Sequence, residues 1–151
     1  DQRIAELDRE ITSVAENDPV AKGLQQLRGV GPLIATALVA AVGNAEQFAN
    51  GRQMAASLGL TPKQHSSGGK DRMLGISKRG DAYLRTILIH GARSVIRTAK
   101  HKDDRLSQWV TSLATRRHAN VAAAALANKT VRIAWAMLRH GTDYQPDRIA
   151  A

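Results

Sequence analysis

The sequence has 151 residues, which suits a single domain. Apolar residues make up 43% of it and aromatic residues only 3%, and the absence of cysteine excludes disulfides and thiolate metal sites. The formal net charge is +9 and the sequence pI is about 10.7, a bias that favours a polyanionic partner, with nucleic acid ahead of an acidic membrane surface.

The composition predicts an all-α fold, because Ala-rich and Leu-rich sequence with few β-branched runs is typical of helices. No stretch is long and apolar enough to span a bilayer, so no membrane partner is expected. The chain begins at Asp1 inside a helical pattern and without Met, and we interpret it as a piece of a longer protein. We expect residues 1–18 to be the end of a coiled-coil linker helix, 19–141 a compact helical domain, and 142–151 a tail.

The first helix carries a heptad-like seam. Its apolar residues recur three, four and three positions apart, at Ile4, Leu7, Ile11 and Val14. Two heptads do not decide between an amphipathic helix that packs on its own domain and the truncated end of a longer coiled coil. Asn17 and Asp18 end this helix, and Pro19 suits the first turn of the next.

The segment 27–42 resembles a helix-hairpin-helix, in which two glycines separate a helix from a second one that ends near Val42. Gly29 and Gly31 permit a tight turn, and the backbone amides that open the second helix can then hold a phosphate with the help of the helix dipole. The alternative is a plain αα-hairpin, whose turns also favour glycine. Contacts of this kind position DNA without reading its bases.

Residues 59–80 form the most unusual stretch. Asn50 is placed to N-cap a short helix over 51–58 that Gly59 ends. Glycines and Pro62 then predict a loop between helices, with the hydroxyls of Ser66 and Ser67 directly before Gly68-Gly69. The surrounding cations suit a phosphate, and they are Lys63, Lys70, Arg72, Lys78 and Arg79. A serine in this setting can attack a phosphodiester, whereas the alternative is a flexible loop with solvated charges.

A long helix follows from Asp81, with its apolar stripe at Leu84, Ile87, Leu88, Ala92, Val95 and Ile96. Its other face is basic, with Arg85, Arg93, Arg97 and Lys100. Between Lys63 and Arg105 there are 11 basic and 4 acidic residues, a net charge of +7 in under a third of the chain. This imbalance favours a nucleic-acid groove over a merely solvated face.

Two more helices complete the expected domain. Asp103-Asp104 start one that Arg116-Arg117-His118 close, and the last runs from about Asn120 to Arg139 and stops at Gly141. Trp109 and Trp135 can stack on bases, but their helical spacing favours core packing.

The titratable residues predict no metal centre in this chain. The five histidines form no metal-ligand spacing, and the scattered carboxylates form no two-metal cluster. His65 lies two residues before Ser67 and can in principle act as its base, although loop histidines are mostly incidental.

Several short motifs recur in the order and spacing of one family. They are Gly59-Leu60-Thr61-Pro62, Ser66-Ser67-Gly68-Gly69, Ile76-Ser77-Lys78-Arg79-Gly80-Asp81 and Tyr83-Leu84-Arg85. In these motifs the chain resembles the C-terminal domain of the IS-one-ten insertion-sequence transposases, relatives of the Piv and MooV DNA invertases. The resemblance covers residues 27–97, with a weaker continuation to Gly141.

The resemblance implies that the protein is a DNA-binding serine recombinase that cuts and rejoins DNA through a phosphoserine. The nucleophile is then Ser67, and Ser66 is the weaker candidate. Lys78 and Arg85 match the family pattern and would hold the scissile phosphate, with Lys70 and Arg72 as further phosphate contacts.

The resemblance also implies partners outside this chain. Members of the family carry an N-terminal domain of the RuvC type, which supplies four acidic residues and Mg²⁺, so this chain would hold only half of the active site and no cofactor of its own. A coiled coil joins the two domains and contributes to homo-oligomerisation, and some members use a structured guide RNA. The competing classes are a non-catalytic helix-hairpin-helix DNA-binding module and an assembly domain whose basic face binds RNA.

Overall fold

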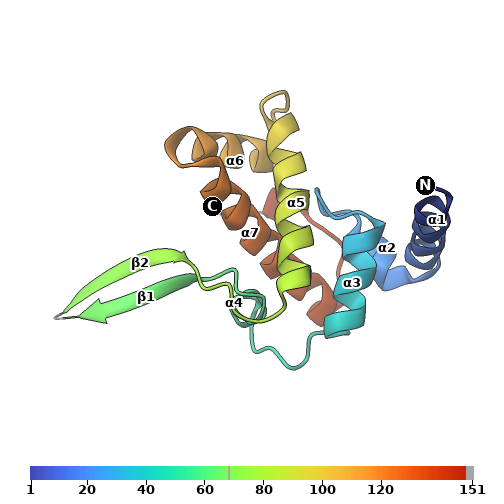
Figure 1. Ribbon diagram of the computed structural model, residues 1–151, viewed down its shortest axis with the longest axis horizontal. Helices are drawn as coiled ribbons and strands as arrows, with labels where there is room; N and C mark the ends of the chain where they lie inside the picture. Colours follow the sequence, from blue (N-terminus) through green and yellow to red (C-terminus); the bar gives the residue numbers. More distant parts are fainter. Residues whose placement is uncertain (68, 149–151) are drawn as a thin grey trace.

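The computed structural model describes residues 1–67 and 69–148, and it describes their side chains except for 64–67 and 70–74. Seven α-helices, one β-hairpin and one 3₁₀ turn make up this part of the chain (Figure 1). In order they are α1 (Gln2–Asn17), α2 (Pro19–Leu24), α3 (Pro32–Val42), α4 (Gly51–Ser57), β1 (Pro62–Ser67), β2 (Lys70–Ile76), α5 (Ala82–Ala99), α6 (Arg105–Arg116), α7 (Ala119–His140) and η1 (Pro146–Arg148). None of the described helices is long and apolar enough to cross a membrane.

The core is built around α7, which contacts α2, α4, α5 and α6. Its small residues Ala122, Ala123, Ala127 and Ala134 are buried and let neighbouring helices approach closely. The larger buried side chains come from several elements: Leu24, Leu38, Met54, Leu60, Leu84 and Leu126. The all-α prediction and its aliphatic core are therefore confirmed.

Five of the described helices begin where a carboxylate or amide side chain accepts a backbone N–H bond. Asp1 accepts from Arg3, Asp18 from Val20, Asn50 from Gln53, Asp81 from Leu84 and Asp104 from Ser107. Such capping is typically worth about 1 kcal/mol per helix. The predicted boundaries at Asn50, Asp81 and Asp104 are confirmed to within one residue.

The prediction that residues 59–80 form a loop is wrong, because much of this stretch is an antiparallel β-hairpin. Ser67 pairs with Lys70, so only Gly68 and Gly69 lie between the two strands in the sequence. Gly-Gly is one of the dipeptides that supply the positive φ angles of tight hairpin turns, and Gly69 has a φ of +76°. Turn chemistry therefore dictates a hairpin here although the strands lack an alternating apolar pattern.

Helix α1 lies at the edge of the molecule against α2 and α3 (Figure 1). Ala15 is buried and Ile11 half-buried, whereas Ile4, Leu7 and Val14 remain 59%, 41% and 57% exposed. The helix thus packs on its own domain and still presents most of its apolar seam to solvent. The division of the chain at residue 18 stays a prediction.

The described part of the C-terminal segment, 142–148, returns across the helical body. The backbone N–H of Tyr144 donates to Gln26 Oε1 at 2.9 Å, and Gln26 Nε2 donates to Asp143 Oδ1 at 3.3 Å. Arg105 Nη1 donates to the carbonyl of Asp147 at 2.8 Å. These bonds fix the segment beside α7.

Candidate nucleic-acid interface

The hairpin of β1 and β2 projects from the helical body as an arm (Figure 1). Its register pairs Ser67 with Lys70, Ser66 with Asp71 and His65 with Arg72. Ser67 is the last residue of β1, so the candidate nucleophile stands at the far end of the arm, beside the turn and opposite a basic position. The side chains of these residues lie outside the described part of the structure.

The base of the arm begins with a tight helix end. The N–H of Gly59 donates to Ala56 O and that of Leu60 to Ala55 O, each at 3.0 Å, which is the Schellman arrangement that closes α4. Gly59 supplies the required positive φ, +71°. Leu60, which follows Gly59, is buried in the core, so the chain is anchored just before β1 begins.

The returning chain packs directly against this helix end. Ser77 N–H donates to Thr61 O at 2.9 Å, and Lys78 N–H donates to Gly59 O at 3.1 Å. Gly80 has a φ of +79°, and a Cβ placed on it would collide with the carbonyl oxygen of Ser57. The two chain segments that carry the arm therefore meet backbone to backbone.

Two side chains hold these backbone segments together through hydrogen bonds. Arg85 Nη1 donates to Leu58 O and to Arg79 O, both at 3.1 Å, and Asn128 Nδ2 of α7 donates to Leu60 O at 3.0 Å. Arg85 is half-buried, unlike Arg93, Arg97 and Lys100, which lie on the exposed face of α5 as expected. The described hydrogen bonds of Arg85 thus position the arm, and a phosphate contact by Arg85 stays a prediction.

Lys78 and Arg79 are exposed at the base of the arm and not at its tip. Strand β2 covers the seven residues from Lys70 to Ile76, and a strand rises about 3.3 Å per residue. The structure therefore separates Lys78, Arg79 and Arg85 from Ser67 by roughly 20 Å. Of the predicted phosphate contacts, it brings to the arm itself only Lys70 and Arg72.

The turn before α3 lies on the other side of α5 from the arm (Figure 1). Gly29 has a φ of +81°, and a Cβ there would come within 2.8 Å of Gly91 O and 2.9 Å of Val95 Cγ2. Gly29 is therefore needed where the turn packs on α5. Gly31 differs, because it is exposed, has open space around its missing side chain and caps α3 without a side-chain hydrogen bond.

Arg28 ties the same turn to α6. Its Nη1 donates to Asp104 Oδ2 at 2.8 Å and to Ser107 Oγ at 2.6 Å. The hydroxyl of Ser107 donates to Asp104 Oδ1 at 2.7 Å, and this bond, with smaller contributions from the Ser107 amide and the Arg28 charge, holds the pKa of Asp104 below its usual value. The turn is thus held in place from two helices.

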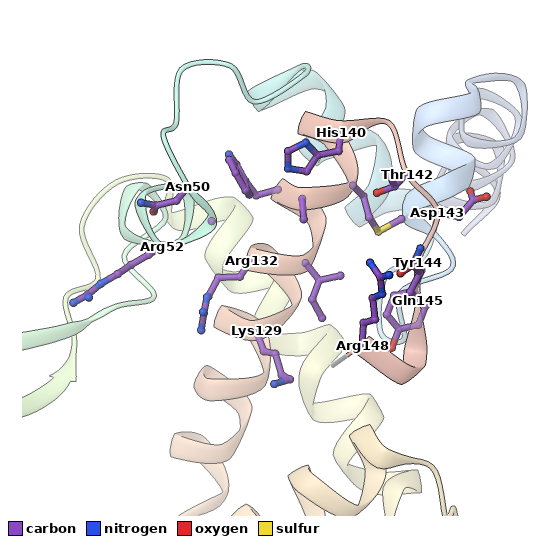
Figure 2. Close-up of a pocket in the computed structure, with 15 residues that line it drawn as sticks. Asn50, Arg52, Lys129, Arg132, His140, Thr142, Asp143, Tyr144, Gln145 and Arg148 are labelled. Atoms are coloured by element: carbon purple, nitrogen blue, oxygen red, sulfur yellow. The ribbon is translucent and has the colours of Figure 1, made fainter. Parts of the chain in front are cut away.

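A group of basic residues away from the arm lines a pocket between α4, the second half of α7 and residues 142–148 (Figure 2). It brings together Arg52, Lys129, Arg132 and Arg148, which the sequence pattern did not single out. These residues lie far apart along the chain, so no local motif could have revealed their proximity. The predicted core tryptophans prove half-buried, with Trp135 on the floor of this pocket.

Among the described residues, no group of three His, Asp or Glu side chains is arranged to hold a metal ion. His90, His101, His118 and His140 are exposed. The Mg²⁺ that the family resemblance implies belongs to a domain outside this chain, so it stays a prediction and no chemical step is assigned to it here.

Comparison with known proteins places these features in context. The model of the IS116/IS110/IS902 transposase family matches residues 21–107. A probable family 20 transposase of Pseudomonas aeruginosa is 52% identical over 95% of this chain and 43% of its own length. Transposases for the insertion elements IS1111A of Coxiella burnetii and IS1328 of Yersinia enterocolitica are 45% and 40% identical over 96% and 93% of this chain. The chain spans about two fifths of the length of these curated relatives.

Proposed function

The chain belongs to the IS116/IS110/IS902 transposase family, and on that premise we propose that it is a DNA-binding catalytic domain that cuts and rejoins DNA through a phosphoserine at Ser67. The observation that carries the proposal is the position of Ser67 at the tip of an arm whose base is locked into the core. A serine on such an arm can reach a DNA backbone that lies at a distance from the helical body.

The chemistry is a transesterification. The Ser67 oxygen attacks the phosphorus, an O–P bond forms, and the P–O bond to one deoxyribose oxygen breaks. The hydroxyl proton ends on the departing oxygen, and the reverse attack by a deoxyribose hydroxyl rejoins the strand and frees the serine. Nothing is oxidised or reduced, and cations near the phosphate stabilise the charge that develops on its oxygens.

A serine hydroxyl needs activation at neutral pH, and the described side chains include no base placed to provide it. We propose that activation and alignment come from acidic residues outside this chain, in the part of the relatives' length that it does not span. The chain alone should then bind DNA and cleave little. Because Lys70 pairs with Ser67 and Arg72 lies on the same strand as Lys70, we expect these two residues to contact the scissile phosphate.

The exposed cations at the base of the arm should contact DNA phosphates away from the point of cleavage. The double variant Lys78→Gln/Arg79→Gln should weaken duplex binding on all sequences alike, because phosphate contacts carry no base readout. Losing two phosphate contacts should reduce the magnitude of the slope of log K against log salt by about 1.8. At 0.1 M salt this corresponds to a roughly 60-fold loss of affinity. Fluorescence anisotropy over a salt series measures both quantities.

The matched control is Arg3→Gln/Arg9→Gln, which removes the same charge from two exposed positions of α1. If this control weakens binding as much as the Lys78/Arg79 variant, net charge alone governs the interaction. Wild-type affinity that does not change with salt would rule out the proposed DNA interface altogether.

Gly31 tests the contribution of the turn before α3. A Gly31→Val chain should fold normally, because Gly31 has a negative φ and open space around its Cβ position. Its side chain should nevertheless screen the first amides of α3 from a phosphate and lower duplex affinity several-fold. Circular dichroism checks the fold, and unchanged affinity in the folded variant would show that the turn is only structural.

A non-catalytic role in assembly is the second candidate, and the exposed seam of α1 favours it. Ile4, Leu7 and Val14 are placed to pair with another helix, as expected for homo-oligomerisation in a longer protein. A structured guide RNA is a further candidate partner of the basic surfaces. Loss of DNA rejoining on removal of Ser67 separates catalysis from both of these roles.

A further inference from the structure

The pocket between α4, α7 and the C-terminal segment has a volume of about 630 Å³ and lies outside the arm (Figure 2). One wall begins at Asn50, Gly51 and Arg52, where the backbone of α4 approaches α7 so closely that a Cβ on Gly51 would lie 2.9 Å from Arg132 Cα. The opposite wall is the segment 142–148, which Gln26 holds in place. This pocket is therefore a fixed feature of the fold.

Its rim is strongly basic. Arg52, Arg132 and Arg148 are exposed around it, and among the described lining residues the only carboxylate is Asp143, which already accepts a hydrogen bond from Gln26. The ion pairs among the described side chains are Arg3–Glu6 and Arg28–Asp104, so no described carboxylate pairs with these three arginines. Burial, and then the nearby charge of Arg132, lower the pKa of Lys129. Cations gathered in this way suit an anion.

The floor of the pocket is aromatic and apolar. Trp135 is half-buried, its Nε1 donates to Phe48 O at 3.3 Å, and its ring meets that of His140 edge to face at a centroid distance of 5.7 Å. Tyr144 is half-buried on the opposite side, and burial raises the pKa of its hydroxyl, which keeps the ring neutral. Rings that are held rigidly lose little entropy when a base stacks on them.

We propose that this pocket seats a single-stranded nucleic-acid segment, with its phosphates on Arg52 and Arg132 and its bases against Trp135 and Tyr144. Arginines beside aromatic rings are the combination that single-strand binding surfaces use. The volume is that of a small-molecule pocket, which accommodates one or two nucleotides but not a duplex. The inference rests on the proposed nucleic-acid function and adds a further contact site, separate from the arm that carries Ser67 and from the turn before α3.

The test compares the affinity of the 151-residue chain for labelled oligonucleotides of about 12 nucleotides, one of deoxythymidine and one of uridine. For single-stranded oligonucleotides, the variant Arg52→Gln/Arg132→Gln should reduce the magnitude of the slope of log K against log salt by about 1.4. Its affinity should fall roughly 25-fold at 0.1 M salt. Both side chains are exposed, so the variant should keep its helical content. The control is Arg3→Gln/Arg9→Gln, whose affinity should change much less.

A second readout does not depend on charge. Trp109 and Trp135 are the only tryptophans, so a Trp109→Phe chain reports on the pocket alone. Its fluorescence should be quenched by the oligonucleotides and much less by a blunt duplex.

The outcomes are distinguishable. A loss on both oligonucleotides shows a pocket that reads the sugar–phosphate backbone, and a loss on one alone identifies DNA or RNA as its occupant. If the variant matches the α1 control on both and Trp135 is not quenched, while duplex DNA still binds with steep salt dependence, only the pocket inference fails. A wild-type chain that binds no nucleic acid overturns this inference and the proposed function together.

Discussion

A Ser67→Ala substitution is expected to abolish the covalent protein–DNA adduct while leaving DNA binding and helical content unchanged. The hydroxyl is the proposed attacking group, and its loss should reduce cleavage by a factor on the order of 10³ or more. The measurement is made on a protein extended to the full length of a relative. Labelled DNA is incubated with it, and the denatured mixture is resolved on a gel.

Ser66→Ala is the matched control, because it removes the same group one residue earlier on the same strand. It should have a milder effect, since Ser66 pairs with Asp71 and lies one position further from the turn. A denaturation-resistant adduct that persists in the Ser67→Ala protein would place the nucleophile elsewhere. The recombinase proposal for this arm would then be wrong, although the binding surfaces described above would still stand.

The helices of this chain could be predicted because their signals are local. Asn50, Asp81 and Asp104 cap helices through bonds to amides only three residues away, and Gly141 ends α7 in the left-handed conformation. Because these bonds join residues that are close together in the sequence, the helix boundaries can be predicted from short sequence segments.

The hairpin escaped prediction because its strands are polar and project away from the core. Hydrophobic alternation marks strands that bury one face, and residues 62–76 show no such alternation. A two-stranded hairpin is marginally stable by itself. Its stability must therefore come from the turn and from the base of the arm, where Arg85 and Asn128 donate hydrogen bonds to backbone carbonyls just before β1. Of these two sources, only the turn can be recognised from a short stretch of sequence.

The pocket could not be predicted for a different reason. Arg52, Arg132 and Arg148 belong to three elements, which meet because Gly51 allows α4 to lie against α7 and because Gln26 holds the segment that carries Arg148. The sequence shows their charge but not their proximity. The segment from Lys63 to Arg105, by contrast, is contiguous, so its net charge of +7 can be counted directly from the sequence, although the structure spreads it over the arm and α5.

Gly80→Ala is expected to be strongly destabilising, by about 2–5 kcal/mol. A φ of +79° costs an alanine about 1–2 kcal/mol. The new methyl group would also collide with the Ser57 carbonyl, and overpacking of this kind costs typically 1–3 kcal/mol. Urea denaturation followed by circular dichroism measures the loss.

Gly141→Ala separates these two contributions, because Gly141 has a φ of +61° but open space around its Cβ position. It should therefore show only the backbone cost of about 1–2 kcal/mol. If Gly80→Ala is no less stable than Gly141→Ala, the two segments at the base of the arm are not packed as described. If the difference is found, proteolytic cleavage between Lys63 and Arg72 should also accelerate in Gly80→Ala, since the collision forces apart the segments that hold the arm in place.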